Sequence, residues 1–143
     1  MWPRLTHLAM HVTDLDACIA FYERYCGMRV CHRRHGGNKD IVWMAEPGRE
    51  ADFVFVIMGG GHRIPLPDGD YRHLGFAVES RARVDEVAAL ARAAGCLLWE
   101  PRQEPWPVGY YCGIIDPEGQ QVEFSYGQPL GPGAEGLALA NDS

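Results

Sequence analysis

Long apolar runs are missing from this chain of 143 residues. The longest continuous apolar strand-like run, Phe53 to Met58, has six residues, whereas a membrane-spanning helix needs about twenty. The first residues, Met1-Trp2-Pro3-Arg4, also lack the basic and apolar regions of a signal peptide. These absences predict an unprocessed cytoplasmic protein with no membrane partner.

Positive charge is also scarce. The chain has 13 lysines and arginines against 19 acidic residues, a formal net charge of −6. Because the basic residues form no stripe beyond Arg29 to Arg34, a nucleic-acid partner is not supported. The five cysteines are an odd number without a Cys-X-X-Cys motif, which favours reduced thiols over a disulfide framework.

What the chain does contain is an internal repeat of about half its own length. Residues 5–13 read Leu-Thr-His-Leu-Ala-Met-His-Val-Thr, and residues 71–79 read Tyr-Arg-His-Leu-Gly-Phe-Ala-Val-Glu, so that His7 corresponds to His73. Each nonapeptide is followed by a capping residue, a helical periodicity and a terminating glycine. The two predicted helices therefore run from Asp14 to Gly27 and from Ser80 to Gly95.

Three strand-like segments follow each helix, and the last two form a hairpin. They are 28–31, 41–44 and 53–58 in the first copy, and 96–99, 110–115 and 121–126 in the second. The pattern predicts an α+β fold of paired β-α-β-β-β modules that form an open, barrel-like mixed sheet around a cleft. We expect a single domain over 1–143, with modules 5–58 and 71–126 and a flexible tail at 127–143.

Strand alternation places three potential metal ligands on the side of the sheet away from the core. His7 and His73 alternate with apolar residues in the equivalent strands, and Glu123 alternates with Val122 and Phe124 in the last strand. One such residue alone is more often a solvated side chain than a ligand. Two histidines and one carboxylate on a common face, however, are the ingredients of a divalent metal site that leaves positions open for a substrate.

These residues resemble the motifs of the vicinal oxygen chelate superfamily, which includes glyoxalase I, bleomycin-resistance proteins, extradiol dioxygenases and fosfomycin-resistance enzymes. The resemblance covers residues 5–126, and it is carried by 6–16, by His73-Leu74-Gly75-Phe76, and by Asp116-Pro117-Glu118-Gly119 with Val122-Glu123-Phe124. It implies that His7, His73 and Glu123 hold a divalent ion (Fe²⁺, Mn²⁺, Zn²⁺ or Ni²⁺). The ion would bind vicinal oxygens of a small substrate and stabilise the negative charge that develops on them.

The resemblance leaves the reaction open between an extradiol dioxygenase and a glyoxalase-like lyase or isomerase of the lactoylglutathione lyase type. Glyoxalase I usually carries a fourth ligand, whose place here maps to about Val54 in an apolar run. A fosfomycin-type site would need a cationic pocket, but Lys39 is the only lysine and no arginine follows Glu123. The alternative is a binding protein of the bleomycin-resistance type that sequesters an aromatic or antibiotic ligand without turnover.

Besides Glu123, we take Tyr111 and His11 as candidate catalytic residues, since either could transfer a proton beside the metal. His11 lies about 13 Å along the strand from His7, so the two cannot share one ion. Tyr110 is an alternative to Tyr111, and Trp106 is a candidate lid over the pocket. We expect a homodimer, and both a site within one chain and a site shared between two chains remain open.

Overall fold

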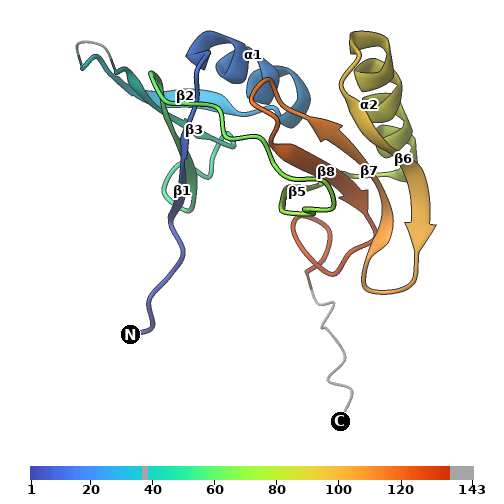
Figure 1. Cartoon of the computed structure of the whole chain (residues 1–143). Helices are drawn as coiled ribbons and strands as arrows, with labels where there is room; N and C mark the ends of the chain where they lie inside the picture. The colour runs from blue at the N-terminus through green and yellow to red at the C-terminus, as the bar shows by residue number, and fades with distance from the viewer. Residues whose placement is uncertain (37–38, 136–143) are drawn as a thin grey trace. The chain divides into compact units, whose positions relative to one another are not determined.

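The computed structural model describes residues 1–36 and 39–135 of the chain (Figure 1). In sequence order the elements are β1 (His7–His11), α1 (Leu15–Cys26), β2 (Arg29–Arg34), β3 (Ile41–Ala45), β4 (Val54–Met58), β5 (His73–Ala77), α2 (Arg81–Ala94), β6 (Leu97–Glu104), β7 (Gly109–Ile115) and β8 (Gln121–Tyr126). The predicted order of strand, helix and three strands, repeated once, is confirmed.

The elements divide into two compact units. The first contains residues 1–66 together with 117–119, and the second contains 67–116 and the chain from Gln120 onward. Each unit has a four-stranded mixed sheet, of order β1-β4-β3-β2 in the first and β5-β8-β7-β6 in the second. The α+β class is therefore confirmed, and neither sheet closes into a barrel within the described residues. The single domain over 1–143 stays a prediction.

Both helices begin and end at the predicted residues. Asp14 accepts a hydrogen bond from the backbone N–H of Ala17, and Ser80 accepts one from Arg83, as N-cap side chains do. Gly27 and Gly95 end the helices with φ of 65° and 75°, a left-handed conformation that glycine adopts without steric penalty. The capping chemistry of the sequence thus sets the helix boundaries.

Two edge strands are longer than the sequence predicted. β6 continues past Trp99 to Glu104, and β2 continues past Cys31 to Arg34. Each is held by antiparallel pairing with a neighbour, β7 or β3, and the register of β6 is irregular between Trp99 and Arg102, which accommodates Pro101. Non-local pairing therefore extends strands whose own polar residues predicted a loop.

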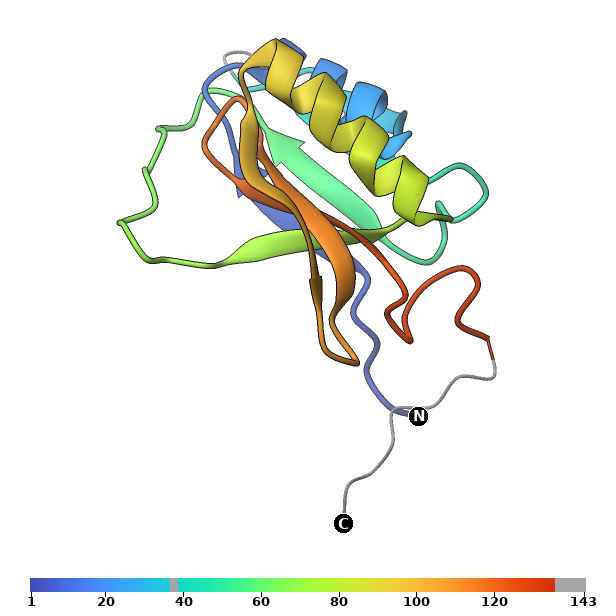
Figure 2. The same ribbon diagram turned by 90° about the vertical axis from the view of Figure 1, so that its right-hand side faces the viewer.

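In each unit one face of the sheet carries the core. α2 packs across β6, β7 and β8 (Figure 2), and its apolar side buries Val84, Val87, Ala88 and Ala91 with Cys112, Ile114, Val122 and Phe124. In the first unit the buried set includes Cys18, Tyr22, Val42, Met44 and Ile57. In each sheet the face away from the core holds the histidines of its parallel edge strand, β1 or β5, as the alternation predicted.

The segment after β8 is only partly described, because residues 136–143 of the predicted tail lie outside the described residues. Residues 127–135 run beside β5 and β8, where a pocket of about 380 Å³ is lined by both the strands and the segment. Of the helices in the described residues, none has the length and apolar character needed to cross a bilayer.

Candidate functional site

His73 and Glu123 face each other across two parallel strands of the second unit. β5 and β8 pair so that Gly75 lies opposite Glu123, with His73 two residues before that glycine. The His73 Nε2 atom lies 3.9 Å from the Glu123 Oε2 atom. The structure therefore brings together two of the three predicted ligands.

The imidazole of His73 is held by its other nitrogen. Its Nδ1 atom lies 2.6 Å from the carbonyl oxygen of Tyr71, and a carbonyl oxygen can only accept. In the neutral ring the proton is therefore on Nδ1, and Nε2 presents its lone pair on the side of Glu123. A histidine that binds a metal is usually oriented by such a backbone contact.

Glu123 is a buried carboxylate, with 8% of its surface exposed. Burial raises the pKa of Glu123, while the charge of His73 and a hydrogen bond from the Gln128 side chain act in the opposite direction. A buried carboxylate is costly unless a cation or hydrogen bonds compensate for the lost hydration. The position is typical of a functional carboxylate rather than a surface one.

Glycines lie on both strands that neighbour this carboxylate. Gly75 lies on β5 and Gly113 on β7, each directly opposite Glu123. The ring of Trp99 covers Gly113 so closely that a Cβ atom there would lie 2.1 Å from Trp99 Cε3. Trp99 also meets His73 edge to face, with ring centroids 5.7 Å apart. The position of Trp99 over a glycine could not be predicted from the sequence, because it depends on strand pairing.

The donors of the second unit fit a divalent ion of intermediate hardness, since imidazole nitrogen and carboxylate oxygen are both ligands for such ions. His7 belongs to the first unit, where it is exposed and its Nδ1 atom lies 3.0 Å from Thr6 Oγ1. Within residues 1–36 and 39–135 no group of three or more His, Cys, Asp or Glu side chains is arranged to hold a metal. The participation of His7 stays a prediction.

The first unit has an open groove on the face that carries His7. Its volume is about 540 Å³, and its lining includes Ala9, His32, Arg34, Trp43 and Val56 together with Thr6, His7, Ile41, 50–53 and Val54. The rings of His32 and Trp43 meet with centroids 5.5 Å apart. The groove is thus mostly apolar, with charged residues at its ends.

Strand register corrects one equivalence between the two copies. His7 lies opposite Val54, and Ala9, the counterpart of Gly75, lies opposite Val56. The counterpart of Glu123 is therefore Val56, two residues beyond the Val54 that the sequence suggested. Either residue is apolar, so the first unit has no carboxylate at this position.

The remaining candidates lie in different surroundings. Tyr111 is buried on the same face as Glu123, and its hydroxyl accepts a hydrogen bond of 2.8 Å from Arg102. Tyr110 lies on the helix face and donates to Asp85, which makes it a structural residue. His11 is exposed at the end of β1, packed against Gly61, and Trp106 is 55% exposed in the turn before β7. The catalytic roles of Tyr111 and His11 stay predictions.

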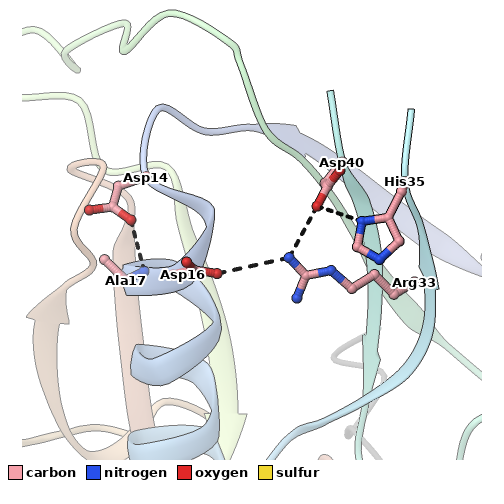
Figure 3. Close-up of polar contacts among 6 residues, drawn as sticks. All are labelled: Asp14, Asp16, Ala17, Arg33, His35 and Asp40. Carbon is pink, nitrogen blue, oxygen red and sulfur yellow. Dashed lines mark hydrogen bonds and ion pairs between the residues drawn. The ribbon is translucent and has the colours of Figure 1, made fainter. Parts of the chain in front are cut away.

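A second cluster of charges in the first unit is internally paired (Figure 3). Arg33 donates a hydrogen bond of 3.1 Å to Asp40 and lies 3.9 Å from Asp16 at the start of α1. His35 lies 3.1 Å from the same Asp40 carboxylate. The hydrogen bond from Arg33 holds the pKa of Asp40 below its ordinary value. These contacts join the polar ends of neighbouring elements, so we read them as structural.

Comparison with known proteins agrees with this fold. Residues 4–124 match the model of the Glyoxalase/Bleomycin resistance protein/Dioxygenase superfamily. An uncharacterized protein of Pseudomonas aeruginosa is 66% identical over 139 residues, 97% of this chain and 99% of the relative.

Two solved structures are similar in fold. One is a mutant of a fosfomycin resistance protein from Listeria monocytogenes, complexed with Mn(II) and a dihydroxypropylphosphonic acid. It is 20% identical with a TM-score of 0.70 and covers 90% of this chain and 95% of its own. The other, the trypanothione-dependent glyoxalase I of Leishmania major, is 22% identical with a TM-score of 0.66 and 87% coverage of both chains.

Proposed function

We propose, on the premise that this chain belongs to the Glyoxalase/Bleomycin resistance protein/Dioxygenase superfamily, that it is a divalent-metal-dependent enzyme. Its substrate would be a small molecule that presents two neighbouring oxygens, and its metal ligands would be His7, His73 and Glu123. One observation carries the proposal: the buried carboxylate of Glu123 lies 3.9 Å from the Nε2 atom of His73. The imidazole ring of His73 is itself held in place by the Tyr71 carbonyl.

A bound divalent ion would supply Lewis-acid stabilisation of negative charge on substrate oxygens. The chain's own residues would supply the rest. The Tyr71 carbonyl orients His73, and Gln128 orients the carboxylate of Glu123. Tyr111 accepts from Arg102 and so keeps its own hydroxyl proton available for transfer. We keep Tyr111, His11 and Glu123 as the proposed proton-transfer groups.

Metal analysis tests the ligand set. Protein purified without chelators should contain a divalent ion, and His73→Ala, Glu123→Gln and His7→Ala should each lower metal affinity about a hundredfold or more. His62→Ala is a matched control, because His62 is an exposed loop histidine. Wild-type protein without metal after reconstitution, or equal metal content in all variants, would contradict the site.

Two assays separate the reaction types that we propose. Fe(II)-loaded protein is supplied with catechols and monitored for oxygen consumption, as an extradiol dioxygenase requires. Zn(II)- or Ni(II)-loaded protein is supplied with methylglyoxal and a thiol, as a glyoxalase-like lyase or isomerase requires. Mn(II), found with the Listeria fosfomycin resistance protein, is tested in both assays.

A second candidate function is sequestration of an aromatic or antibiotic ligand. The apolar groove of the first unit favours it, since its volume of about 540 Å³ is within the range of small-molecule sites. This function predicts ligand binding that is unchanged in His73→Ala and Glu123→Gln, with no turnover in either assay. Turnover that is lost in both variants would reject it.

We also propose that the protein acts in the cytoplasm as a homodimer. All five cysteines are among the described residues, and none of them forms a disulfide, which supports a reducing compartment. Sedimentation at several concentrations would test the dimer, and a monomer at all of them would contradict it.

A further inference from the structure

Arg34 is a guanidinium that lines the first-unit groove without a partner. Among residues 1–36 and 39–135 its side chain makes no hydrogen bond or ion pair, whereas the adjacent Arg33, on the other side of the same strand, is paired with Asp40. Arg34 lies opposite Ile41 in the ladder of β2 and β3, two residues beyond the His32–Trp43 pair. It therefore places one positive charge at an end of the apolar groove.

The acidic residues of the groove already have partners. Glu50 accepts a hydrogen bond from the Gly48 backbone, and Asp52 lies 3.6 Å from Arg49. Both belong to the loop that enters β4, whose first residue lies opposite His7. Among the described residues, Arg34 is thus the one arginine or lysine of the groove lining, whereas Glu50 keeps its negative charge beside a neutral donor at the β4 loop. The groove therefore favours an anion at the Arg34 end, away from that loop.

Between these ends the surface is flat and apolar. Ala9, Val56, Trp43 and His32 form one row across all four strands, and Trp43 leaves 43% of its surface exposed. An indole exposed beside small apolar side chains offers a stacking surface for a planar ring. The groove volume of about 540 Å³ is large enough for such a molecule.

We propose that this groove binds a planar, apolar molecule bearing one carboxylate, with the carboxylate on Arg34 and the ring against Trp43. A guanidinium matches a carboxylate in shape and charge through two parallel hydrogen bonds. A phosphonate dianion would bring a second charge that no other cation in the groove lining balances, and the acids of the β4 loop would repel it. The expected ligand is therefore an aromatic monocarboxylate.

The inference deepens the proposed function, and it rests on that function only for the claim that the bound acid is a substrate. Binding itself needs no metal. The measurements are therefore made on the full chain in the presence of a chelator, with metal affinity of the same variants measured separately. Absence of acid binding in protein that retains its metal affinity would contradict this inference alone. Absence of metal affinity in protein that binds the acid would contradict the proposed function alone.

The experiment is calorimetric titration with 2-naphthoate, its neutral analogue 2-naphthamide, and 2-naphthylphosphonate. The carboxylate should bind about tenfold to a hundredfold more tightly than the amide, as expected for a charge-assisted hydrogen-bonded pair. Arg34→Gln should abolish that preference while leaving amide binding and metal affinity unchanged. Trp43→Leu should weaken both ligands.

Arg33→Gln is the matched control, because it removes an adjacent arginine on the opposite face and should leave naphthoate affinity as in the wild type. Equal binding of acid and amide, equal losses in the two arginine variants, or tighter binding of the phosphonate would overturn the proposal. Sedimentation of Trp43→Leu adds a further check. Dissociation of a dimer with unchanged naphthoate affinity would also overturn it, and would assign the groove to a second copy of the chain.

Discussion

The two units share one architecture and differ at the centre of their open sheet faces. The second has a glutamate, Glu123, between two glycines, of which Gly113 is covered by Trp99, where the first has Val56 between Ala9 and Trp43. Both retain the histidine of the parallel edge strand. One copy therefore presents a buried carboxylate and the other an apolar surface.

We propose that this difference separates two tasks within a duplicated scaffold. A carboxylate that is to hold an ion needs burial together with an open side, and at Glu123 the open side is that of Gly75, since Trp99 fills the space beside Gly113. A surface that receives the body of an organic molecule needs a flat ring and few buried charges. If the units are divided in this way, they should differ in chemical reactivity and in their response to substitution.

The largest difference should be in the reactivity of two strand thiols, one from each unit. Cys31 is exposed on β2 of the first unit, whereas Cys112 is buried on β7 of the second, where burial raises its pKa to about 12. At pH 8 only about one Cys112 side chain in ten thousand would be ionised. Iodoacetamide should therefore label Cys31 in minutes and Cys112 only after unfolding, as followed by mass spectrometry. Comparable labelling of both thiols in folded protein would refute the burial of Cys112. The Cys31→Ser variant is the control, since it should lack the rapidly labelled species in the mass spectrum.

The glycines beside Glu123 should respond unequally to an added methyl group. In Gly113→Ala the new Cβ would lie 2.1 Å from the Trp99 ring, so the variant should lose about 1–3 kcal/mol of unfolding free energy. Gly75→Ala meets its nearest atom, Glu123 Oε2, at 3.7 Å, and its first-unit counterpart is already Ala9. Its unfolding free energy should stay within about 0.5 kcal/mol of the wild type.

Urea denaturation measures both glycine variants. Trp99→Ala combined with Gly113→Ala should recover part of the loss, because the clash partner is gone. A Gly113→Ala variant as stable as Gly75→Ala would mean that Trp99 does not cover Gly113 in solution.

Glu118 should give the first unit an acid-sensitive contact. Its carboxylate accepts hydrogen bonds from the Thr13 backbone, the Thr13 hydroxyl and the Asp14 backbone at 2.6–2.8 Å. Burial alone would raise the pKa of Glu118, but these hydrogen bonds outweigh burial and lower it below the ordinary 4.5. The stabilisation is therefore fully present above pH 4.5 and is lost as the pH falls through the lowered pKa.

Glu118→Gln should cost about 1–3 kcal/mol of unfolding free energy at pH 7 and should show a smaller further loss on acidification than the wild type. Thermal unfolding between pH 3 and pH 7 measures both effects. Glu46→Gln, in the corresponding β3–β4 turn, is the control, since Glu46 is a half-exposed partner of Arg49. Parallel pH profiles of wild type and Glu118→Gln would rule out this carboxylate as the source.

The smallest expected effect is the loss of a helix N-cap, and it should be the same in the two units. Asp14→Ala and Ser80→Ala each remove one N-cap hydrogen bond, to Ala17 and Arg83 respectively, and each should lower the unfolding free energy by about 1 kcal/mol. Chemical denaturation should find the two losses equal within error. A large inequality would show that the helices are not equivalent in the two units.

The sequence predicted the features that depend on neighbouring residues. The helix boundaries at Asp14 and Gly27 follow from capping chemistry, and β8 follows from its alternation, which also placed Glu123 on the open face. The continuation of β6 through Pro101 could not be predicted, because it depends on pairing with β7. The same limit applies to the site, where the contact between Gly113 and Trp99 exists only once the strands are aligned.

Arg34 escaped sequence analysis for a related reason. It belongs to the basic run 29–34, but the predicted strand ended at residue 31, so the sequence assigned no face to Arg34 or to the paired Arg33. The mapping of Glu123 to Val54 rather than Val56 likewise erred by two residues, because register is a property of strand pairs. Alternation gives the face of a residue but not its neighbour across the sheet.

The parallel edge strands have a kinetic consequence. β1 and β5 each pair with a strand roughly fifty residues further along the chain, whereas the other pairs in each sheet are formed by consecutive strands, and distant pairings close the larger and entropically costlier loops. We expect β2–β3–β4 and β6–β7–β8 to form first and the histidine strands to dock last. His7 and His73 would then reach their final positions only as each sheet is completed. The positions of these two proposed metal ligands would therefore be set in the final step of folding.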